Sequence, residues 1–333
     1  MKIQLFTLLF LLIAFQAQAQ YIPGTAQSFQ FASAFNPAFS GIDNFGDLKL
    51  SYRYQWTGFG SNAPRFINLA YNSRLKQPLD LSINSSRSSN VSALNPELLP
   101  KGKRIIHGFG VNFFNEQYGV INRIGGGLNY AFHYPLFKKT RLSFGASAMV
   151  DNTKVDVSKV GVREPDNDPF YQSLLASGSS QTNLNVRGGV LIYSPTFYFG
   201  ASYFPILNSA IQDDGVSTSD IFYQGSLQGG IRIPVGENSS IRPSVMALWQ
   251  LDNTFAIDYS VKVFLQEKVW FGLTYRDTQS GILLFGIDIN DKMGFAYSYE
   301  LSMGGRSQFT NGSHDLVLAF RFNNFRRQNQ YAW

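Results

Sequence analysis

The stretch LKLSYRYQW, residues 48–56, decides how this sequence folds. Apolar and aromatic residues alternate in it with polar and charged ones, at a period of two. A β-strand points successive side chains to opposite faces, so this stretch predicts a strand with one apolar and one polar face. The fold then depends on what covers the apolar face, which is either a second sheet of the same chain or the hydrocarbon of a membrane.

The same alternation recurs almost to the end of the chain. It is clear at 124–134, 142–150, 257–263, 293–299 and 316–322, and less strict at 65–72, 107–115, 184–193, 196–204, 222–233, 241–251, 269–275 and 282–289. Together these runs predict about 14 strands of roughly 8–12 residues, the length that a tilted membrane-spanning strand needs. No helical period intervenes between them.

The connections between these strands differ in length at the two ends. Tight turns are expected at 135–140, 194–195, 234–240, 266–268 and 290–292, and long loops at 151–183, 205–220 and 300–313. Outer-membrane barrels have short periplasmic turns and longer outer loops, and this pattern matches them. The connection 73–106 is long where a turn is expected, so we interpret it as an inserted periplasmic loop, or else as a segment that hides a further strand pair.

The composition favours a large amount of half-buried sheet. Of 333 residues, 44% are hydrophobic, 15% are aromatic and only 15% are charged, against roughly 25% charged in soluble domains. The formal net charge is +6, but no segment carries a dense Lys/Arg cluster, so nucleic-acid binding is not predicted. Cysteine is absent, which excludes disulfide scaffolds and thiolate metal sites.

The N-terminus predicts export from the cytoplasm. Lys2 precedes an apolar run at 3–15, and Ala-Gln-Ala follows at 17–19. This is the pattern of a signal peptide cleaved near residue 19, and the alternatives are an N-terminal anchor and a buried strand. No later apolar run approaches the ~18 residues of a membrane-spanning helix, so a membrane form of this chain must cross with strands.

Charged residues in mid-strand bear on the choice between lipid and protein core. Between two sheets each would need a partner, whereas facing a watery lumen they cost little. Aromatics also gather near strand ends, as in the girdles of membrane barrels. We therefore predict an all-β transmembrane barrel over 48–322, with 20–47 as an N-terminal segment placed in the lumen and 323–333 as a basic tail. The candidate lumen-lining residues are Arg53, Arg123, Arg187, Asp258, Lys262 and Arg321.

The sequence contains no catalytic or cofactor-binding motif. The three histidines, His107, His133 and His314, are far apart, and no nucleophile elbow, HExxH or phosphate-binding loop is present. The acidic stretch 164–168 lacks the ligand spacing of an EF-hand, so a solvated outer loop is favoured over calcium binding. We predict neither an enzyme nor a cofactor or metal site.

Ten blocks of the chain resemble one family in its order. They are NPAFSG at 36–41, YRYQWTGFGSNAPRF at 52–66, NYAFHYPL at 129–136, RLSFGASA at 141–148, DNDPFYQ at 166–172, SPTFYFGASYFPILN at 194–208, IRPSVMALWQ at 241–250, VWFGLTYRD at 269–277, GFAYSYELS at 294–302 and SHDLVLAFRF at 313–322. On these blocks the chain resembles the PorP/SprF family of type IX secretion system outer-membrane proteins. The segment 73–106 and the tail depart from the family pattern.

The resemblance implies a non-enzymatic barrel in the cell outer membrane that assists export or surface anchoring of clients such as adhesins, including those of gliding motility. It implies as partners outer-membrane lipid, type IX clients, and periplasmic secretion-system or peptidoglycan-binding proteins. The main alternative is an outer-membrane channel for a small solute, lined by the charged residues above. A secreted soluble β-protein, such as a lectin or propeller, is a more remote alternative.

Overall fold

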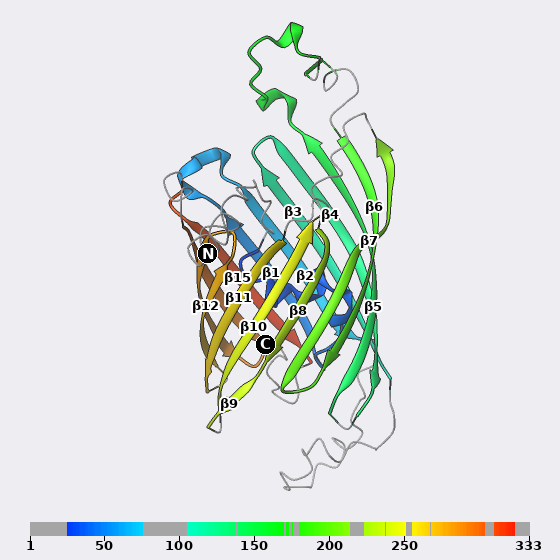
Figure 1. Cartoon of the computed structure of the whole chain (residues 1–333), viewed down its shortest axis with the longest axis vertical. Helices are drawn as coiled ribbons and strands as arrows, with labels where there is room; N and C mark the ends of the chain where they lie inside the picture. The colour runs from blue at the N-terminus through cyan, green and yellow to red at the C-terminus, as the bar shows by residue number, and fades with distance from the viewer. Residues whose placement is uncertain are drawn as a thin grey trace, which may run out of the picture.

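The computed structural model describes residues 25–75, 105–137, 139–169, 171–172, 175, 180–213, 223–236, 238–250, 255–266, 268–303 and 310–323. Within them the chain forms a closed antiparallel β-barrel of 14 strands, as the sequence predicts (Figure 1). The strands are β1 Gly46–Tyr54, β2 Arg65–Arg74, β3 Ile106–Tyr118, β4 Ile121–Pro135, β5 Arg141–Val155, β6 Ser180–Tyr193, β7 Phe197–Asp213, β8 Tyr223–Ile231, β9 Ile233–Val235, β10 Ser239–Gln250, β11 Phe255–Leu265, β12 Val269–Arg276, β13 Ser280–Asn290, β14 Met293–Ser302 and β15 Ser313–Phe322.

Two of these elements make one barrel strand. Both β8 and β9 pair with the same edge of β10, and only Arg232 separates them. The barrel closes where β1 pairs with β15, from Gly46 opposite Phe322 to Tyr54 opposite His314. Because β10 also pairs with β11, the ladder of backbone hydrogen bonds runs around the whole wall.

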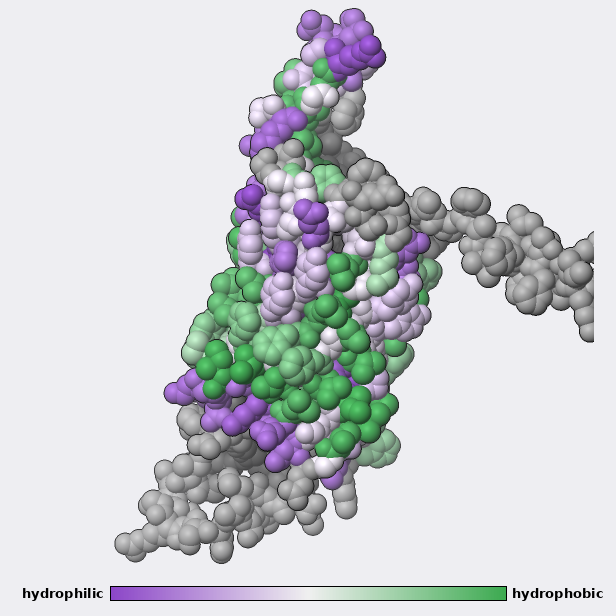
Figure 2. Space-filling view, turned by 90° about the vertical axis from the view of Figure 1, so that its left-hand side faces the viewer, coloured by the Kyte–Doolittle hydropathy of each residue, from purple (hydrophilic) through white to green (hydrophobic). Residues whose placement is uncertain are grey.

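The apolar face of the strands points outward. On β1, Leu50 and Tyr52 are 40% and 42% exposed, whereas the alternate residues Ser51 and Arg53 are 0% and 1% exposed. The same alternation holds on β15. Figure 2 shows an apolar band on the face of the barrel that it draws, with polar residues above and below this band. The apolar side chains thus lie where a membrane would contact them.

Short and long connections lie at opposite ends of the barrel. The connections 136–140, 194–196, 236–238, 266–268 and 291–292 lie at one end, here called the turn end, which faces the periplasm in outer-membrane barrels. The opposite end, here called the loop end, carries the long connection between β5 and β6. Two loop-end connections, 119–120 and 277–279, are as short as turns.

Several predicted boundaries are wrong at the loop end. β5 continues to Val155, β6 begins at Ser180 and β7 continues to Asp213, so the long loops are shorter than predicted. Backbone pairing continues there, with Lys154 opposite Ser180, but the outward side chains include Asn152 and Thr182, which hydrogen-bond to each other. Above the apolar band, pairing no longer requires an apolar outward face, and the alternation that marks a strand is lost.

Two further predictions need correction. Trp56 does not belong to the first strand, because it has φ 49° and precedes the 3-10 helix η3, Thr57–Asn62. Short helical turns also occur before β1, although no helical period is visible there; each spans only three or four residues, which is too short to show one.

The predicted signal peptide 1–19, most of the insertion 73–106 and the tail beyond residue 323 lie outside the described residues. Among the described residues, no helix is both long enough and apolar enough to span a membrane.

The outward face generates a stability prediction. Leu128 lies at the middle of β4 and is 65% exposed. Replacing it in Leu128→Arg should lower the free energy of unfolding by about 2–4 kcal/mol, the cost of a cation at the bilayer midplane. Denaturant unfolding in phospholipid vesicles measures this change. As a control, Gly161→Arg lies in the β5–β6 connection, where an added Cβ meets nothing within 4 Å; equal losses in both variants would contradict a lipid-facing wall.

Candidate functional site in the barrel lumen

Residues 25–45, here called the lumen segment, run inside the barrel before the first strand (Figure 1). The segment contains the 3-10 helix η1, Ser28–Phe31, the single α-helical turn α2, Ala32–Phe35, and the 3-10 helix η2, Pro37–Phe39. Most of it is buried, although it belongs to no sheet. Its contacts with the wall therefore determine what the lumen can do.

Asn36 fixes the centre of the lumen segment to the wall. Its side-chain Nδ2 donates to the carbonyl oxygens of Val190 on β6 and Ala201 on β7, at 3.1 and 3.2 Å. Its Oδ1 accepts from the N–H of Ala38 at 3.0 Å and so caps η2. The residue before a proline favours an extended backbone, and proline suits the first helical position, so Asn-Pro sets this geometry locally.

Three wall glycines let the backbone of the lumen segment lie directly on the strands. A Cβ added to Gly108 on β3 would lie 2.0 Å from the carbonyl oxygen of Ser40, and one added to Gly145 on β5 would lie 2.3 Å from the nitrogen of Ala38. One added to Gly189 on β6 would lie 2.0 Å from Oδ1 of Asn36. Any side chain at these positions would displace the segment.

Polar side chains of the wall hydrogen-bond to the carbonyl groups of the lumen segment. Asn129 donates to Ser33 at 3.0 Å, Ser143 to Ala38 at 2.8 Å, Ser202 to Phe35 at 2.8 Å, Arg187 to Ala34, and Arg74 to Gly41 and Ile42 at 3.0 and 2.8 Å. Short helical turns leave such carbonyl groups without partners of their own. The polar inner face of the barrel supplies them, so each carbonyl is buried at little cost.

His133 makes one of these contacts and has no catalytic arrangement around it. It is fully buried, with Nε2 2.9 Å from the carbonyl oxygen of Ser40 and Nδ1 3.0 Å from the hydroxyl of Tyr193. Because a carbonyl oxygen only accepts, Nε2 carries the proton and Nδ1 accepts from the tyrosine. The ring is thus a structural link between the lumen segment and the wall.

The start of the lumen segment is held by the opposite wall. Asp315 on β15 accepts from the hydroxyl of Thr25 and from the N–H of Ala26, each at 3.0 Å. The Phe29 ring packs edge-on against Trp270, with the centroids 5.5 Å apart, and Nζ of Lys262 lies 3.6 Å from the Phe29 centroid. The segment therefore bridges the lumen from β15 and β12 to β5, β6 and β7.

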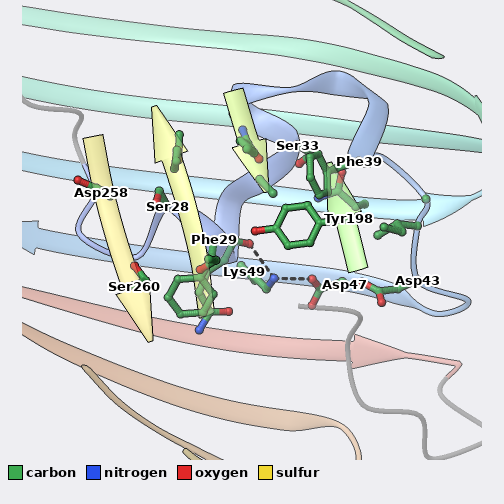
Figure 3. Close-up of a pocket in the computed structure, with 18 of the residues that line it drawn as sticks. Ser28, Phe29, Ser33, Phe39, Asp43, Asp47, Lys49, Tyr198, Asp258 and Ser260 are labelled. Atoms are coloured by element: carbon green, nitrogen blue, oxygen red, sulfur yellow. Dashed lines mark hydrogen bonds and ion pairs between the residues drawn. The ribbon is translucent and has the colours of Figure 1, made fainter. Parts of the chain in front are cut away.

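Lys49 binds the segment at η1. Its ammonium donates to the carbonyl oxygen of Gln30 at 2.7 Å and pairs with Asp47 at 2.9 Å, as Figure 3 shows. Both partners in this ion pair are nearly inaccessible to water.

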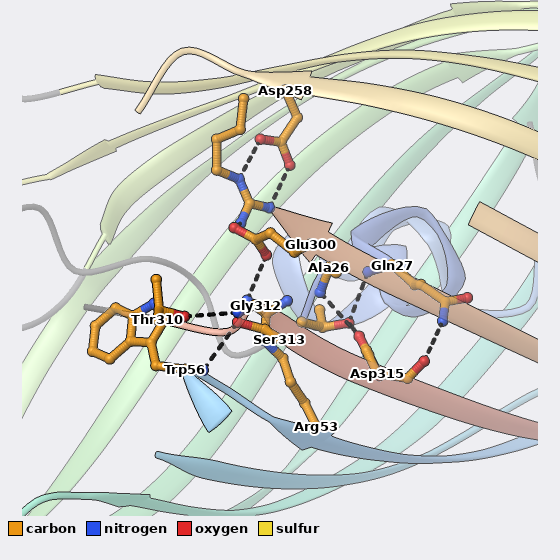
Figure 4. A network of polar contacts seen from close by, with 12 residues as sticks. Ala26, Gln27, Arg53, Trp56, Asp258, Glu300, Thr310, Gly312, Ser313 and Asp315 are labelled. Carbon is orange, nitrogen blue, oxygen red and sulfur yellow. Dashed lines mark hydrogen bonds and ion pairs between the residues drawn. The ribbon is translucent and has the colours of Figure 1, made fainter. Parts of the chain in front are cut away.

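A chain of ion pairs runs along one side of the inner wall, from β11 to β1, beside the segment (Figure 4). Glu300 accepts a hydrogen bond from Arg53 at 2.7 Å and lies 3.5 Å from the guanidinium of Arg276. Arg276 in turn donates two hydrogen bonds to Asp258, at 2.6 and 2.8 Å. Two guanidinium groups thus face two carboxylates. The network neutralises itself, which is the condition under which charges are buried without a large penalty.

The structure places the six candidate lumen residues on the inner face of the wall but not in one cluster. Arg53 and Asp258 join the network through Glu300 and Arg276, and Arg321 pairs with Asp288 at 2.6 Å near the turn end. Lys262 lies beneath Phe29. Arg123 and Arg187 line a hollow nearer the loop end.

The set of candidates predicted from sequence missed Glu300, Arg276 and Asp315. Glu300 and Asp315 lie on the polar faces of β14 and β15, so strand alternation marks both as inward-facing. The pairing of Glu300 with Arg53, 247 residues away, follows only from barrel closure.

Among the described residues, an inner and an outer hollow lie beside the lumen segment. The inner hollow has about 910 Å³ of empty space, including its open mouth, and is lined by polar groups such as Asp43, Tyr198 and Ser260 (Figure 3). The outer hollow, about 1020 Å³ measured in the same way, lies toward the loop end. Within the described part of the chain, no group of three or more His, Asp or Glu side chains is arranged to hold a metal ion.

The glycine contacts generate a second prediction. In Gly145→Ala the new methyl group should push residues 36–41 off the wall and lower the free energy of docking by about 1–3 kcal/mol. Amide exchange in these residues should become faster, by roughly tenfold for each ~1.4 kcal/mol. Hydrogen–deuterium exchange of the lumen segment measures this. Gly229→Ala is the matched control, because its Cβ would meet Phe199 at an ordinary 3.5 Å. Unchanged exchange in Gly145→Ala would refute close docking.

Comparison with solved structures finds outer-membrane barrels. The Acinetobacter baumannii protein Omp33 is 12% identical with a TM-score of 0.44, over 85% of this chain and 100% of that chain. The Pseudomonas putida toluene transporter TodX is 9% identical with a TM-score of 0.47, over 92% of this chain and 95% of that chain. No curated protein matches the sequence.

Comparison with family models gives a match over nearly the whole described barrel. The model of the type IX secretion system membrane protein PorP/SprF matches residues 17–320, a range that includes the lumen segment and all strands up to most of β15. The match and the barrel fold support a location in the outer membrane. The chain belongs to the PorP/SprF family of type IX secretion system membrane proteins.

Proposed function

We propose that this chain is a non-enzymatic outer-membrane component that assists export or surface anchoring of type IX client proteins such as adhesins. It reaches the membrane through a signal peptide cleaved near residue 19. Its loop end contacts the client, and its turn end contacts periplasmic secretion-system or peptidoglycan-binding proteins. Family membership supplies the secretion context.

One observation supports an anchoring role above all: the lumen is occupied by a segment tied to both walls. The lumen segment is held by Asp315 on one side and by Asn129, Ser143 and Ser202 on the other. A solute channel needs a continuous aqueous path, whereas an anchor needs a rigid body in the membrane. Ties to opposite walls brace the barrel and favour the anchor.

Surface attachment tests this role. In cells with a type IX system, deletion of the gene for this chain should remove at least one type IX client from the cell surface, and the tagged full-length chain should restore and co-purify with it. Proteomics of the protease-accessible surface measures the loss. A surface proteome identical in the deleted and complemented cells would contradict the proposal.

A solute channel is the second candidate function. The inner and outer hollows and the charged residues around them favour it, because they are open recesses beside the lumen segment. In planar bilayers we expect the intact barrel to show no steady conductance, and a variant lacking residues 25–45 to conduct. Steady, solute-selective conductance by the intact barrel would instead support the channel.

A further inference from the structure

The outer hollow combines apolar side chains with a guanidinium group. Its lining includes two apolar side chains from the lumen segment, Ala34 and Phe35, and five from the wall: Phe66, Phe114, Met149, Phe204 and Leu248. Inner faces of membrane barrels are usually polar. The apolar side chains elsewhere in this lumen, such as Trp270, Ile282 and Leu284, are buried in a cluster with the lumen segment, whereas those of the outer hollow line an open recess. Apolar side chains gathered around a water-accessible recess are typical of a ligand site.

Arg187 lies in this apolar lining. Its guanidinium is 4.0 Å from the centroid of Phe204, lies 3.4 Å from the sulfur of Met149 and donates to the carbonyl oxygen of Ala34. Its Nε is buried without a hydrogen-bond partner, and no carboxylate of the described residues forms an ion pair with it. Since a guanidinium has five N–H donors, Arg187 retains donors that can form hydrogen bonds with a ligand.

The charges around Arg187 are already engaged. Asp151 is the carboxylate that acts electrostatically on it. One oxygen of Asp151 accepts from Arg123 at 3.2 Å and the other from Asn185 at 2.7 Å. Glu116, which also lines the hollow, lies opposite Arg123 in the β3–β4 register. Arg187 is therefore the guanidinium best placed to receive an incoming acceptor.

We propose that the outer hollow binds an apolar carboxylate, with an aromatic or branched group among the phenylalanines and its carboxylate on Arg187. A guanidinium matches a carboxylate through two parallel hydrogen bonds, and phenylalanine rings favour a flat apolar partner. Two sources present this chemistry: the C-terminal residue of a polypeptide that enters from the loop end, and a free small acid. The inference goes beyond the proposed function and does not depend on it.

Calorimetry on the full-length chain in lipid nanodiscs tests the proposal. The probes are N-acetylphenylalanine, its uncharged amide, phenylacetate and the tripeptide Ala-Ala-Phe. We expect the acid to bind at least tenfold more tightly than the amide, and Arg187→Gln to abolish that preference. Arg163→Gln, on the exposed β5–β6 connection, is the matched control and should retain it.

The relative affinities of the probes distinguish the two ligand sources, and they also show whether the proposed site exists. Tighter binding of the tripeptide Ala-Ala-Phe than of phenylacetate identifies a chain end as the ligand, and the reverse order identifies a free acid; both support the site. Equal affinity for acid and amide, or no binding of any probe, overturns it. The acid–amide comparison uses the unmodified chain, so it decides the matter even where Arg187→Gln fails to fold.

Discussion

In hydrocarbon, each backbone N–H and C=O group of a sheet needs a partner, because no water is present to supply one. The pairing of β1 with β15 and of β10 with β11 meets this requirement by removing both edges of the sheet. Every other feature depends on this closed ladder. It directs alternate side chains into lipid and lumen, and it brings residues near the two ends of the chain into contact, as in the ion pair between Arg53 and Glu300.

A closed wall of 14 strands leaves more space than its own side chains fill. The lumen segment occupies part of that space through backbone contacts. Glycines at 108, 145 and 189 allow its main chain to approach the wall, and Ser143 and Asn129 bond to its carbonyl groups. The polar inner face thus serves two purposes. It would tolerate water, and it also provides hydrogen-bond partners to a peptide segment that contains only short helical turns.

The distribution of charge divides the lumen into regions. Toward β11 to β15, guanidinium and carboxylate groups neutralise one another, which rigidifies the wall where the lumen segment begins. Around the outer hollow, Arg187 contacts a ring, a sulfur and a carbonyl. The first arrangement balances its own charges. The second leaves hydrogen-bonding capacity that suits a ligand, so binding chemistry and structural support occupy different parts of one barrel.

The sequence by itself determined the fold class, the number of strands and the face turned toward lipid, because a period of two is a local property that lipid on one side and a polar lumen on the other enforce in every strand. It also marked Arg53 and Lys262 as inward-facing. Only the tertiary structure decided which inward residues meet, as in the docking of Asn36 on Val190 and Ala201. Helical turns of three or four residues show no period, and contacts more than 150 residues apart follow from the curvature and closure of the wall, which no local pattern encodes.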